Sequence, residues 1–297
     1  MSGVKPPRTV KPFLKWAGGK RRLLDEILPK IKVDRGVFYE PFLGAGAVFL
    51  NMPSQVRKVG SDVNSELINV WRCVRDEPDK LLSALAKLKN TRTEFLRVRS
   101  WDRSPDWPHA YPDTDRAART IFLNKTCFNG LYRVNSRGEF NVPYGDQSNA
   151  RIMDFETIQQ ASKLLNTLDS QGQTAEILNL DYRAVVQRAS SGDYVYFDPP
   201  YIPQSRTASF VAYSEGGFTF EEQIELRNVA LVLIATGVKI LISNSDTAES
   251  RQLYSHSAFS VSSISVTRAI GAASNSRKAA KEILVMGGLD KAIRGDK

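Results

Sequence analysis

The sequence has little of the chemistry that disulfides and metal sites need. Two cysteines, Cys73 and Cys127, and two histidines occur among its 297 residues. Two thiols cannot form a disulfide framework, and so few Cys and His side chains do not supply the ligands of a structural zinc site. The sequence therefore predicts a protein without a bound metal, in a reducing, cytoplasmic location.

Long hydrophobic runs are also absent. The apolar stretch 229–235 is far shorter than the roughly 20 residues that span a bilayer. Residues 1–10 lack the apolar core of a secretion signal. Hydrophobic residues make up 42% of the chain and charged residues 25%, which is typical of a folded globular protein. We expect a soluble protein with no membrane partner, monomeric in solution.

Acidic side chains are outnumbered, with 32 Asp and Glu against 41 Lys and Arg, for a net charge of +9 at pH 7. The excess lies in residues 1–35, 89–151 and 268–297, and the rest of the chain is acidic on balance. Solvated surface charge is one interpretation. The other is that the three segments meet on one face and bind phosphates. Composition favours neither.

The order of predicted elements indicates the fold class. Strands and helices alternate at both ends of the chain, which predicts an α/β fold with a largely parallel sheet. Residues 65–185 interrupt that alternation with helices and loops and should form a lobe of their own. The tail predicts an antiparallel hairpin at the sheet edge. Strands are predicted at 37–39, 57–61, 194–197, 238–243, 260–268 and 282–286, and helices at 21–31, 64–71, 80–89, 115–123 and 220–236.

A glycine turn follows the first predicted strand. Gly44 and Gly46 lie between that strand and an apolar segment, and Asp62 closes the next strand. Glycines let a ligand approach the backbone, and an acid at that place can bind ribose hydroxyls. Phe49 occupies the position of the third glycine of the dinucleotide fingerprint. A structural turn is the simpler interpretation, but the acid favours an adenosyl-type ligand.

The sequence Asp198-Pro199-Pro200-Tyr201 follows the apolar strand 194–197. Two successive prolines lack N–H groups and hold a stiff, extended turn. A carboxylate and a carbonyl fixed there can accept both N–H bonds of an exocyclic amine, and the tyrosine ring can stack on a planar base. The pattern favours a base-modifying site over a plain turn with an exposed carboxylate.

Trp16 lies among small residues in the segment Phe13–Lys20. Its ring could stack on adenine or attract a sulfonium cation through its π-face. A core tryptophan at a glycine turn is the alternative.

These three stretches, with Asp62, Asn129–Arg133 and Arg137–Pro143, occur in the order found in Dam-type (D12 class) DNA adenine-N6 methyltransferases, which the chain resembles from about residue 11 to 287. The resemblance implies an α/β, Rossmann-like S-adenosylmethionine-dependent sheet with an inserted helical target-recognition lobe and a C-terminal β-hairpin. It implies a catalytic domain of residues 1–64 and 186–297 and a DNA-binding lobe of residues 65–185. The implied reaction is methyl transfer from S-adenosylmethionine to a flipped adenine in a GATC-like site of double-stranded DNA, as in restriction–modification systems.

The resemblance also implies roles for single residues. The catalytic set is Asp198, Pro199, Pro200 and Tyr201. The cofactor set is Trp16, Lys20, Glu40, Phe42, Gly44, Gly46, Asp62 and Asp198. The DNA-binding set is Lys15, Asn129, Arg133 and Asn135, to which the basic tail adds Arg277 and Lys278 as a backbone clamp.

One stretch departs from the family. After residues 141–145, where GATC-specific relatives continue with basic and aromatic residues, this chain has Asp146-Gln147-Ser148. The resemblance therefore does not extend to recognition of the outer base pairs. Two rival functions are cytosine-N4 methylation, in which Ser usually replaces Asp198, and DNA binding without catalysis, against which the intact motifs argue. Neither cysteine follows a proline, which argues against cytosine-C5 methylation.

Overall fold

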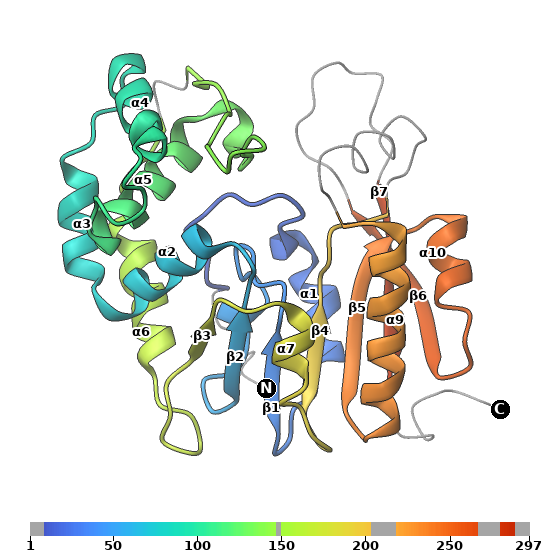
Figure 1. Cartoon of the computed structure of the whole chain (residues 1–297). Coiled ribbons are helices and arrows are strands. Elements are labelled where there is room, and N and C mark those ends of the chain that lie inside the picture. The colour runs from blue at the N-terminus through green and yellow to red at the C-terminus, as the bar shows by residue number, and fades with distance from the viewer. Residues whose placement is uncertain (1–8, 147–149, 203–217, 267–279, 289–297) are drawn as a thin grey trace, which may run out of the picture. The chain divides into compact units, whose positions relative to one another are not determined.

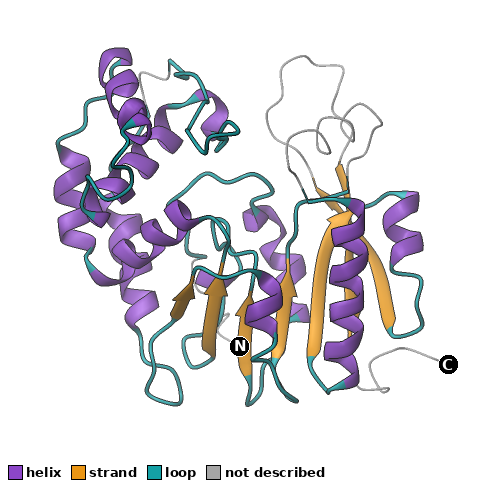
Figure 2. Cartoon of the chain, viewed as in Figure 1, coloured by secondary structure: helices purple, strands orange, loops and turns teal. Residues whose placement is uncertain are grey.

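The computed structural model describes residues 9–146, 150–202, 218–266 and 280–288. Its strands form one mixed sheet in the order β3-β2-β1-β4-β5-β7-β6 (Figures 1 and 2). Strands β2, β1, β4 and β5 pair in parallel, whereas β7 is antiparallel to both β5 and β6. The predicted α/β class is therefore confirmed. The strands are β1 (Val37–Glu40), β2 (Arg57–Ser61), β3 (Glu176–Leu178), β4 (Tyr194–Phe197), β5 (Lys239–Ser245), β6 (Phe259–Val266) and β7 (Ala280–Gly287).

The helices begin at side chains that cap them. Asn64 accepts a hydrogen bond from the N–H of Leu67 at the start of α2, as predicted. Thr219 and Glu222 form a reciprocal capping box at the start of α9. The helices are α1 (Leu24–Ile27), α2 (Ser65–Asp76), α3 (Pro78–Ala86), α4 (Arg92–Arg99), α5 (Asp113–Thr126), α6 (Phe155–Asn166), α7 (Tyr182–Val186), α9 (Phe220–Ala235) and α10 (Ala248–Leu253).

The segment predicted as one helix over 21–31 differs in the structure. It consists of a 3₁₀ turn (Lys20–Leu23), the single turn α1 and a second 3₁₀ turn (Leu28–Lys30). Pro29 lies in the second 3₁₀ turn, where it cannot donate the backbone hydrogen bond that an α-helix needs. The apolar spacing still buries Leu23, Leu24 and Ile27, so the periodicity predicted the buried face but not the helix type.

The chain forms two compact units. The first comprises Met1–Arg21, Gly44–Gln55 and Asp62–Asn179, and the second comprises Arg22–Leu43, Val56–Ser61 and Leu180–Lys297. The second unit contains β1, β2 and β4–β7, and its core includes every side chain of β4 and all those of β5 after Lys239. In the first unit, helices α4 and α5 and the loop after them enclose a core of Phe95, Val98, Phe122, Leu123, Cys127, Phe140 and Val142.

Both cysteines are free and buried. Burial raises the pKa of the Cys73 thiol to about 12 and that of Cys127 to about 11. Within the described ranges, no helix is both long and apolar enough to cross a membrane. The same ranges contain no group of His, Cys, Asp and Glu that could hold a metal ion.

Candidate active site

The glycine turn after β1 is held by Asp62. Gly44 and Gly46 have φ values of +46° and +61°, which non-glycine residues rarely adopt. The N–H of Gly44 donates to Asp62 Oδ2 at 3.1 Å, and the N–H of Asn64 donates to Asp62 Oδ1 at 3.0 Å. Trp71 Nε1 donates to the carbonyl of Gly44 at 3.0 Å. The turn is therefore fixed at both its amide and its carbonyl.

Asp62 follows β2 directly and keeps its carboxylate in a largely buried place. Burial raises the pKa of this carboxyl above its usual value, and hydrogen bonds from the N–H groups of Asn64, Gly44 and Val63 oppose the shift. A carboxylate has more acceptor sites than these donors use. The Val63 side chain beside it is 68% exposed. The hydrogen bonds between Asp62 and the glycine turn therefore fix both the turn and the orientation of the Asp62 carboxylate.

The N-terminal segment lies against this turn. A Cβ on Gly44 would come within 3.0 Å of Cδ1 of Trp16, so only glycine fits there without displacing the indole. The Trp16 ring stacks on Tyr132 with ring centroids 5.2 Å apart and an interplanar angle of 29°. Lys20 is buried, and its Nζ donates to the carbonyl of Gly18 at 2.5 Å. The structure therefore brings Trp16, Gly44 and Asp62 together.

Asn124, at the end of α5, joins the N-terminal segment to the turn that follows α5. Its Nδ2 donates to the carbonyls of Lys15 at 2.7 Å and Gly130 at 3.0 Å, and its Oδ1 accepts from the N–H of Lys15 at 2.9 Å. Asn129 has a left-handed backbone, with φ +55°. One buried amide thus fixes the backbone beside two residues of the predicted DNA-binding set, Lys15 and Asn129.

The stretch from 129 to 141, here called the 129–141 loop, presents the other predicted DNA contacts. Arg133 is exposed, and its Nε donates to Asn141 Oδ1 at 2.8 Å. Asn135 Oδ1 accepts from the N–H groups of Arg137 and Glu139, so this side chain shapes the loop itself. Leu131 and Val134 are 44% and 40% exposed. The loop therefore offers both a guanidinium and apolar side chains to solvent.

In the second unit, the Asp198–Tyr201 turn follows β4, whose parallel neighbours are β1 and β5. Gln223 of α9 donates to the carbonyl of Pro200 at 2.7 Å. Asn244 of β5 donates to Gln223 Oε1 at 3.0 Å and accepts from the N–H of Ile202 at 3.1 Å. Gln223 and Asn244 are almost completely buried. Two buried, hydrogen-bonded side chains, one from α9 and one from β5, therefore fix the backbone at Pro200 and Ile202.

Tyr201 is oriented by an acid on β7. Its hydroxyl donates to Glu282 Oε2 at 2.7 Å. Burial, with the nearby Asp198 carboxylate, holds the pKa of Tyr201 well above its usual range, so the hydroxyl stays protonated and keeps donating. Glu282 thus limits how the ring can turn.

Phe42 belongs to an aromatic cluster. It follows the carboxyl end of β1, and Asp198 follows the carboxyl end of the neighbouring parallel strand β4. The Phe42 ring stacks on Tyr182 at 5.3 Å, meets Phe218 edge-on at 5.7 Å and lies 6.5 Å from Phe197, the residue before Asp198. Glu40, two residues before Phe42, is 3% exposed. These contacts place Phe42 in an aromatic cluster that includes Phe197, the residue before Asp198.

Several site residues were not predicted. Gln223, Glu282 and Asn124 carry no motif that composition or periodicity would single out, and each contacts a residue distant in sequence. Tyr132 belongs to the block Asn129–Arg133 that resembles the family, but its contact with Trp16 was not predicted. Asn244 lies in a stretch, 241–244, that resembles the family, and a buried asparagine at a strand end was the available signal. Arg277, Lys278, Gln147 and Ser148 lie outside the described residues.

Three comparisons bear on what these features do. The family model of D12 class N6 adenine-specific DNA methyltransferases matches residues 16–270. A Type II methyltransferase, M1.LlaDCHI of Lactococcus lactis subsp. cremoris, is 40% identical over 93% of this chain and 95% of its own. Type II methyltransferase M.MjaIII of Methanocaldococcus jannaschii is 39% identical over 80% and 84% of the two chains.

A third relative is called a DNA adenine methylase rather than a Type II methyltransferase. The DNA adenine methylase of Escherichia coli K12 is 36% identical over 92% of this chain and 94% of its own. The residues matched by the family model include the glycine turn, the 129–141 loop and the Asp198–Tyr201 turn. The chain belongs to the D12 class of N6 adenine-specific DNA methyltransferases.

Proposed function

We propose that this methyltransferase moves a methyl group from S-adenosylmethionine to N6 of an adenine that is flipped out of double-stranded DNA, within a GATC-like site. The observation that carries the mechanism is the hydrogen bond from Gln223 to the carbonyl of Pro200. It commits the Pro200 carbonyl to the protein, which supports our assignment of the Pro199 carbonyl to the substrate.

The residues around the glycine turn suit the proposed cofactor. The buried carboxylate of Asp62 has acceptor capacity for ribose hydroxyls, and the left-handed turn at Gly44 keeps side chains away from the backbone. We assign Trp16, Lys20, Gly44, Gly46 and Asp62 to cofactor binding. Glu40, Phe42 and Asp198 complete the set, Asp198 at the methionine end. S-adenosylmethionine, when bound, supplies an electrophilic methyl group on a sulfonium.

The target amine needs activation, because its lone pair is delocalised into the adenine ring. In this proposal, the Asp198 carboxylate and the Pro199 carbonyl accept its two N–H bonds and favour a tetrahedral nitrogen whose lone pair is localised. Tyr201, held by Glu282, stacks on the flipped base. The stiffness of the two prolines and the chain Asn244–Gln223–Pro200 keep both acceptors in place, so the protein contributes alignment rather than a reactive group.

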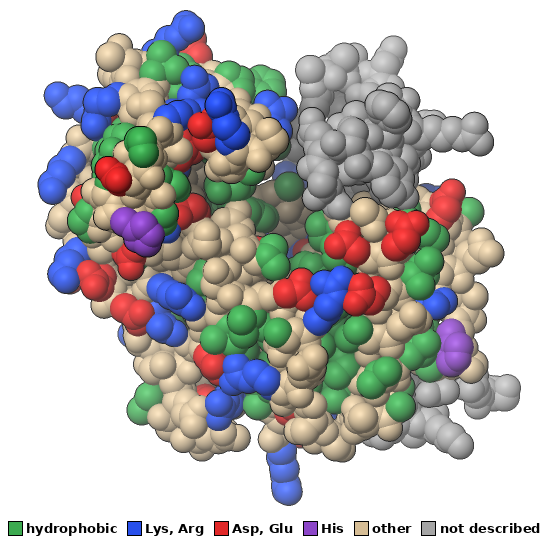
Figure 3. Space-filling model, in the orientation of Figure 1, with side chains coloured by type: hydrophobic (Ala, Val, Ile, Leu, Met, Phe, Trp, Pro, Cys, Tyr) green, Lys and Arg blue, Asp and Glu red, His purple; other side chains and the backbone are tan. Residues whose placement is uncertain are grey.

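DNA binding is assigned to the lobe of residues 65–185 and to the C-terminal hairpin. On the face seen in Figure 3, Lys and Arg side chains gather over the part of the first unit that holds α3, α4 and α5. Lys15, Asn129, Arg133 and Asn135 belong to the connected segments described above, and Arg277 and Lys278 are assigned to the phosphate backbone. A cytoplasmic monomer that modifies DNA beside a restriction enzyme completes the proposal, in keeping with the Type II names of two relatives.

Radiolabelled methyl transfer to duplex DNA, followed by nucleoside analysis, tests this function. The expected product is N6-methyladenine, and Asp198→Ala should lower turnover by more than about a hundredfold while the protein stays folded and binds DNA. N4-methylcytosine as the product would establish the rival reaction. DNA binding with no transfer by the wild type would establish the binding-only function.

A further inference from the structure

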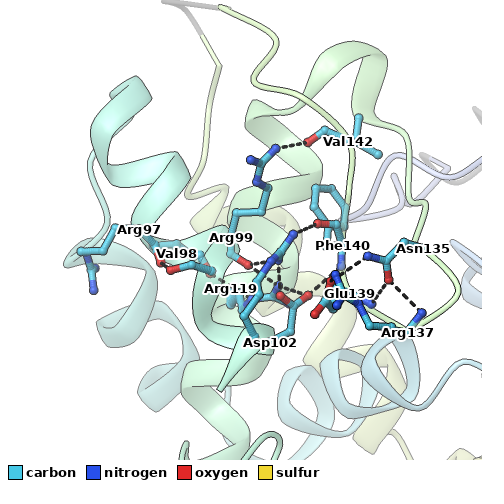
Figure 4. A network of polar contacts seen from close by, with 12 residues as sticks. Arg97, Val98, Arg99, Asp102, Arg119, Asn135, Arg137, Glu139, Phe140 and Val142 are labelled. Carbon is cyan, nitrogen blue, oxygen red and sulfur yellow. Dashed lines mark hydrogen bonds and ion pairs between the residues drawn. The ribbon is translucent and has the colours of Figure 1, made fainter. Parts of the chain in front are cut away.

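A buried ion pair lies beneath the 129–141 loop, in the lobe that we assign to DNA (Figure 4). Asp102 Oδ2 and Arg119 Nη2 are 2.5 Å apart, and each side chain is only 4% exposed. Asp102 belongs to the 3₁₀ turn Ser100–Arg103 that follows α4, and Arg119 belongs to α5. A buried pair of this kind contributes little net stability compared with apolar residues of the same volume, because its charges must lose their hydration. The pair therefore matters more for the backbone that it holds in place than for stability.

Asp102 and its neighbour Arg103 hold the backbone of one loop residue from both sides. Asp102 Oδ2 accepts from the N–H of Phe140 at 2.7 Å, and Arg103 Nη2 donates to the carbonyl of Phe140 at 2.5 Å. Arg103 also pairs with Asp102. Both peptide groups of Phe140 are thus bound by charged side chains, which form stronger hydrogen bonds than neutral ones.

Arg119 ties this clamp to the end of α4. Its Nε donates to the carbonyl of Val98 and its Nη2 to the carbonyl of Arg99, each at 3.0 Å. Both carbonyls belong to the last turn of α4. The clamp on Phe140 is therefore anchored to both α4 and α5 rather than to a single mobile turn.

Contacts within the loop connect the clamped residue Phe140 to the exposed side chain of Arg133. Val134 and Phe140 form an antiparallel bridge, and the N–H of Asn141 donates to the carbonyl of Arg133 at 3.1 Å. Asn141, next to Phe140, accepts from Nε of Arg133 at 2.8 Å. The position of Phe140 therefore sets the position of the Arg133 guanidinium, with one residue between the clamp and the exposed side chain.

We propose that Asp102, together with Arg103 and Arg119, is a positioning group that sets how the 129–141 loop meets DNA without touching DNA itself. This inference rests on the proposed function, since it takes the loop to be a DNA-contacting segment. The group acts on affinity and site discrimination, and leaves the glycine turn and the Asp198–Tyr201 turn unchanged.

Two variants test the proposal. Asp102→Asn removes the charge from the clamp. Arg103→Ala removes the bond to the Phe140 carbonyl and replaces a side chain that is 33% exposed rather than buried. Amide hydrogen exchange of the variants, without ligands, should be faster over residues 134–140. Steady-state methylation should show a KM for DNA raised by about tenfold, the effect of losing one charge-assisted contact. Both kcat and the affinity for S-adenosylhomocysteine should stay within about twofold of the wild type.

Arg97→Ala is the matched control. It removes a positive charge from α4, the helix just before the turn that holds Asp102 and Arg103, and its partner Glu94 lies on α4 rather than on the loop. It should change neither exchange over 134–140 nor discrimination between a GATC duplex and duplexes with one substituted base pair, whereas Arg103→Ala should weaken that discrimination.

Unchanged exchange in both clamp variants would overturn the proposal, as would faster exchange with an unchanged KM for DNA. A wild type that fails to methylate DNA would instead overturn the proposed function. The exchange measurement would then still decide whether Asp102 and Arg103 hold the loop.

Discussion

The side-chain amide of Gln223 donates to the carbonyl of Pro200 at 2.7 Å, from a helix more than twenty residues further along the chain. Gln223 is 1% exposed, and its own carbonyl accepts from Asn244. The Asp198–Tyr201 turn, which has no regular secondary structure, is thereby held by two regular elements, α9 and β5. The two prolines stiffen the turn itself, and the hydrogen bonds of Gln223 fix the turn to the rest of the unit.

Gln223→Ala should lower kcat by roughly tenfold or more, because the Pro199 carbonyl then loses its fixed direction. It should also cost about 1–3 kcal/mol of unfolding free energy, since Asn244 and Pro200 lose a buried partner. Single-turnover methyl transfer and thermal unfolding measure the two effects. Asn228→Ala, at an exposed position of the same helix, should change neither. A Gln223→Ala enzyme with full kcat would show that the turn holds itself.

Tyr201→Phe should retain most activity, losing only a few-fold in kcat, because the ring can still stack when its bond to Glu282 is gone. Tyr201→Ala should lose far more, since the stacking contribution of about 1–3 kcal/mol disappears. Fluorescence of a 2-aminopurine at the target position reports base flipping in each variant. Equal losses in the two variants would mean that the hydroxyl, not the ring, is what the reaction needs.

If Asp62 binds the cofactor as we propose, the affinity for the cofactor should depend on pH. Burial raises the pKa of this carboxyl, so it takes up a proton at a higher pH than an exposed aspartate does. Because the charged carboxylate is the form that accepts hydrogen bonds from ribose hydroxyls, affinity for S-adenosylhomocysteine should fall as the pH is lowered through that raised pKa. Calorimetric titration across this range measures the affinity. In Asp62→Asn the affinity should be lower at neutral pH and flat with pH, and a slope equal to that of the wild type would assign the titration to another group.

Arg133→Ala should lose about 1–3 kcal/mol of discrimination at one position of the site, because a guanidinium pairs bidentately with guanine O6 and N7. A phosphate contact would instead lower affinity evenly across sites. Methylation rates on a set of single-substituted GATC duplexes distinguish the two. A uniform loss would contradict base recognition. If the wild type tolerates substitution of the outer pairs, the Asp146-Gln147-Ser148 departure is the first segment to exchange for that of a GATC-specific relative.

Neutralising Arg277 and Lys278 together should weaken binding to all sequences alike and flatten the dependence of affinity on salt, because each phosphate contact releases counterions. Fluorescence anisotropy at several salt concentrations measures the slope. Arg21 and Arg22 are exposed basic residues of the N-terminal segment. Neutralising this second pair gives a salt slope for the loss of the same charge elsewhere on the chain. An unchanged slope in the first pair would identify ordinary surface charge.

The sequence predicted the fold where local chemistry decides it. The apolar strand 194–197 followed by Asp-Pro-Pro, the capping Asn64 and the strand 57–61 all have signals within a few residues. It did not predict Gln223, Glu282 or the Asp102–Arg119 pair, because each acts through one contact between elements separated by many residues. An aspartate inside the Trp-rich stretch 100–115 looks like any solvated loop acid, and only packing against α5 shows that it is buried. The helix over 21–31 was wrong in type because one proline outweighed a correct apolar pattern.

The burial of both cysteines makes the protein a convenient host for site-specific chemistry. With thiol pKa values of about 12 at Cys73 and about 11 at Cys127, almost no thiolate is present at neutral pH, and thiolate is the form that maleimides attack. A single cysteine introduced at Ser136, an exposed position of the 129–141 loop, would therefore carry a fluorophore without removal of the native thiols. A change in the fluorescence of such a label on addition of DNA would show whether the loop meets DNA.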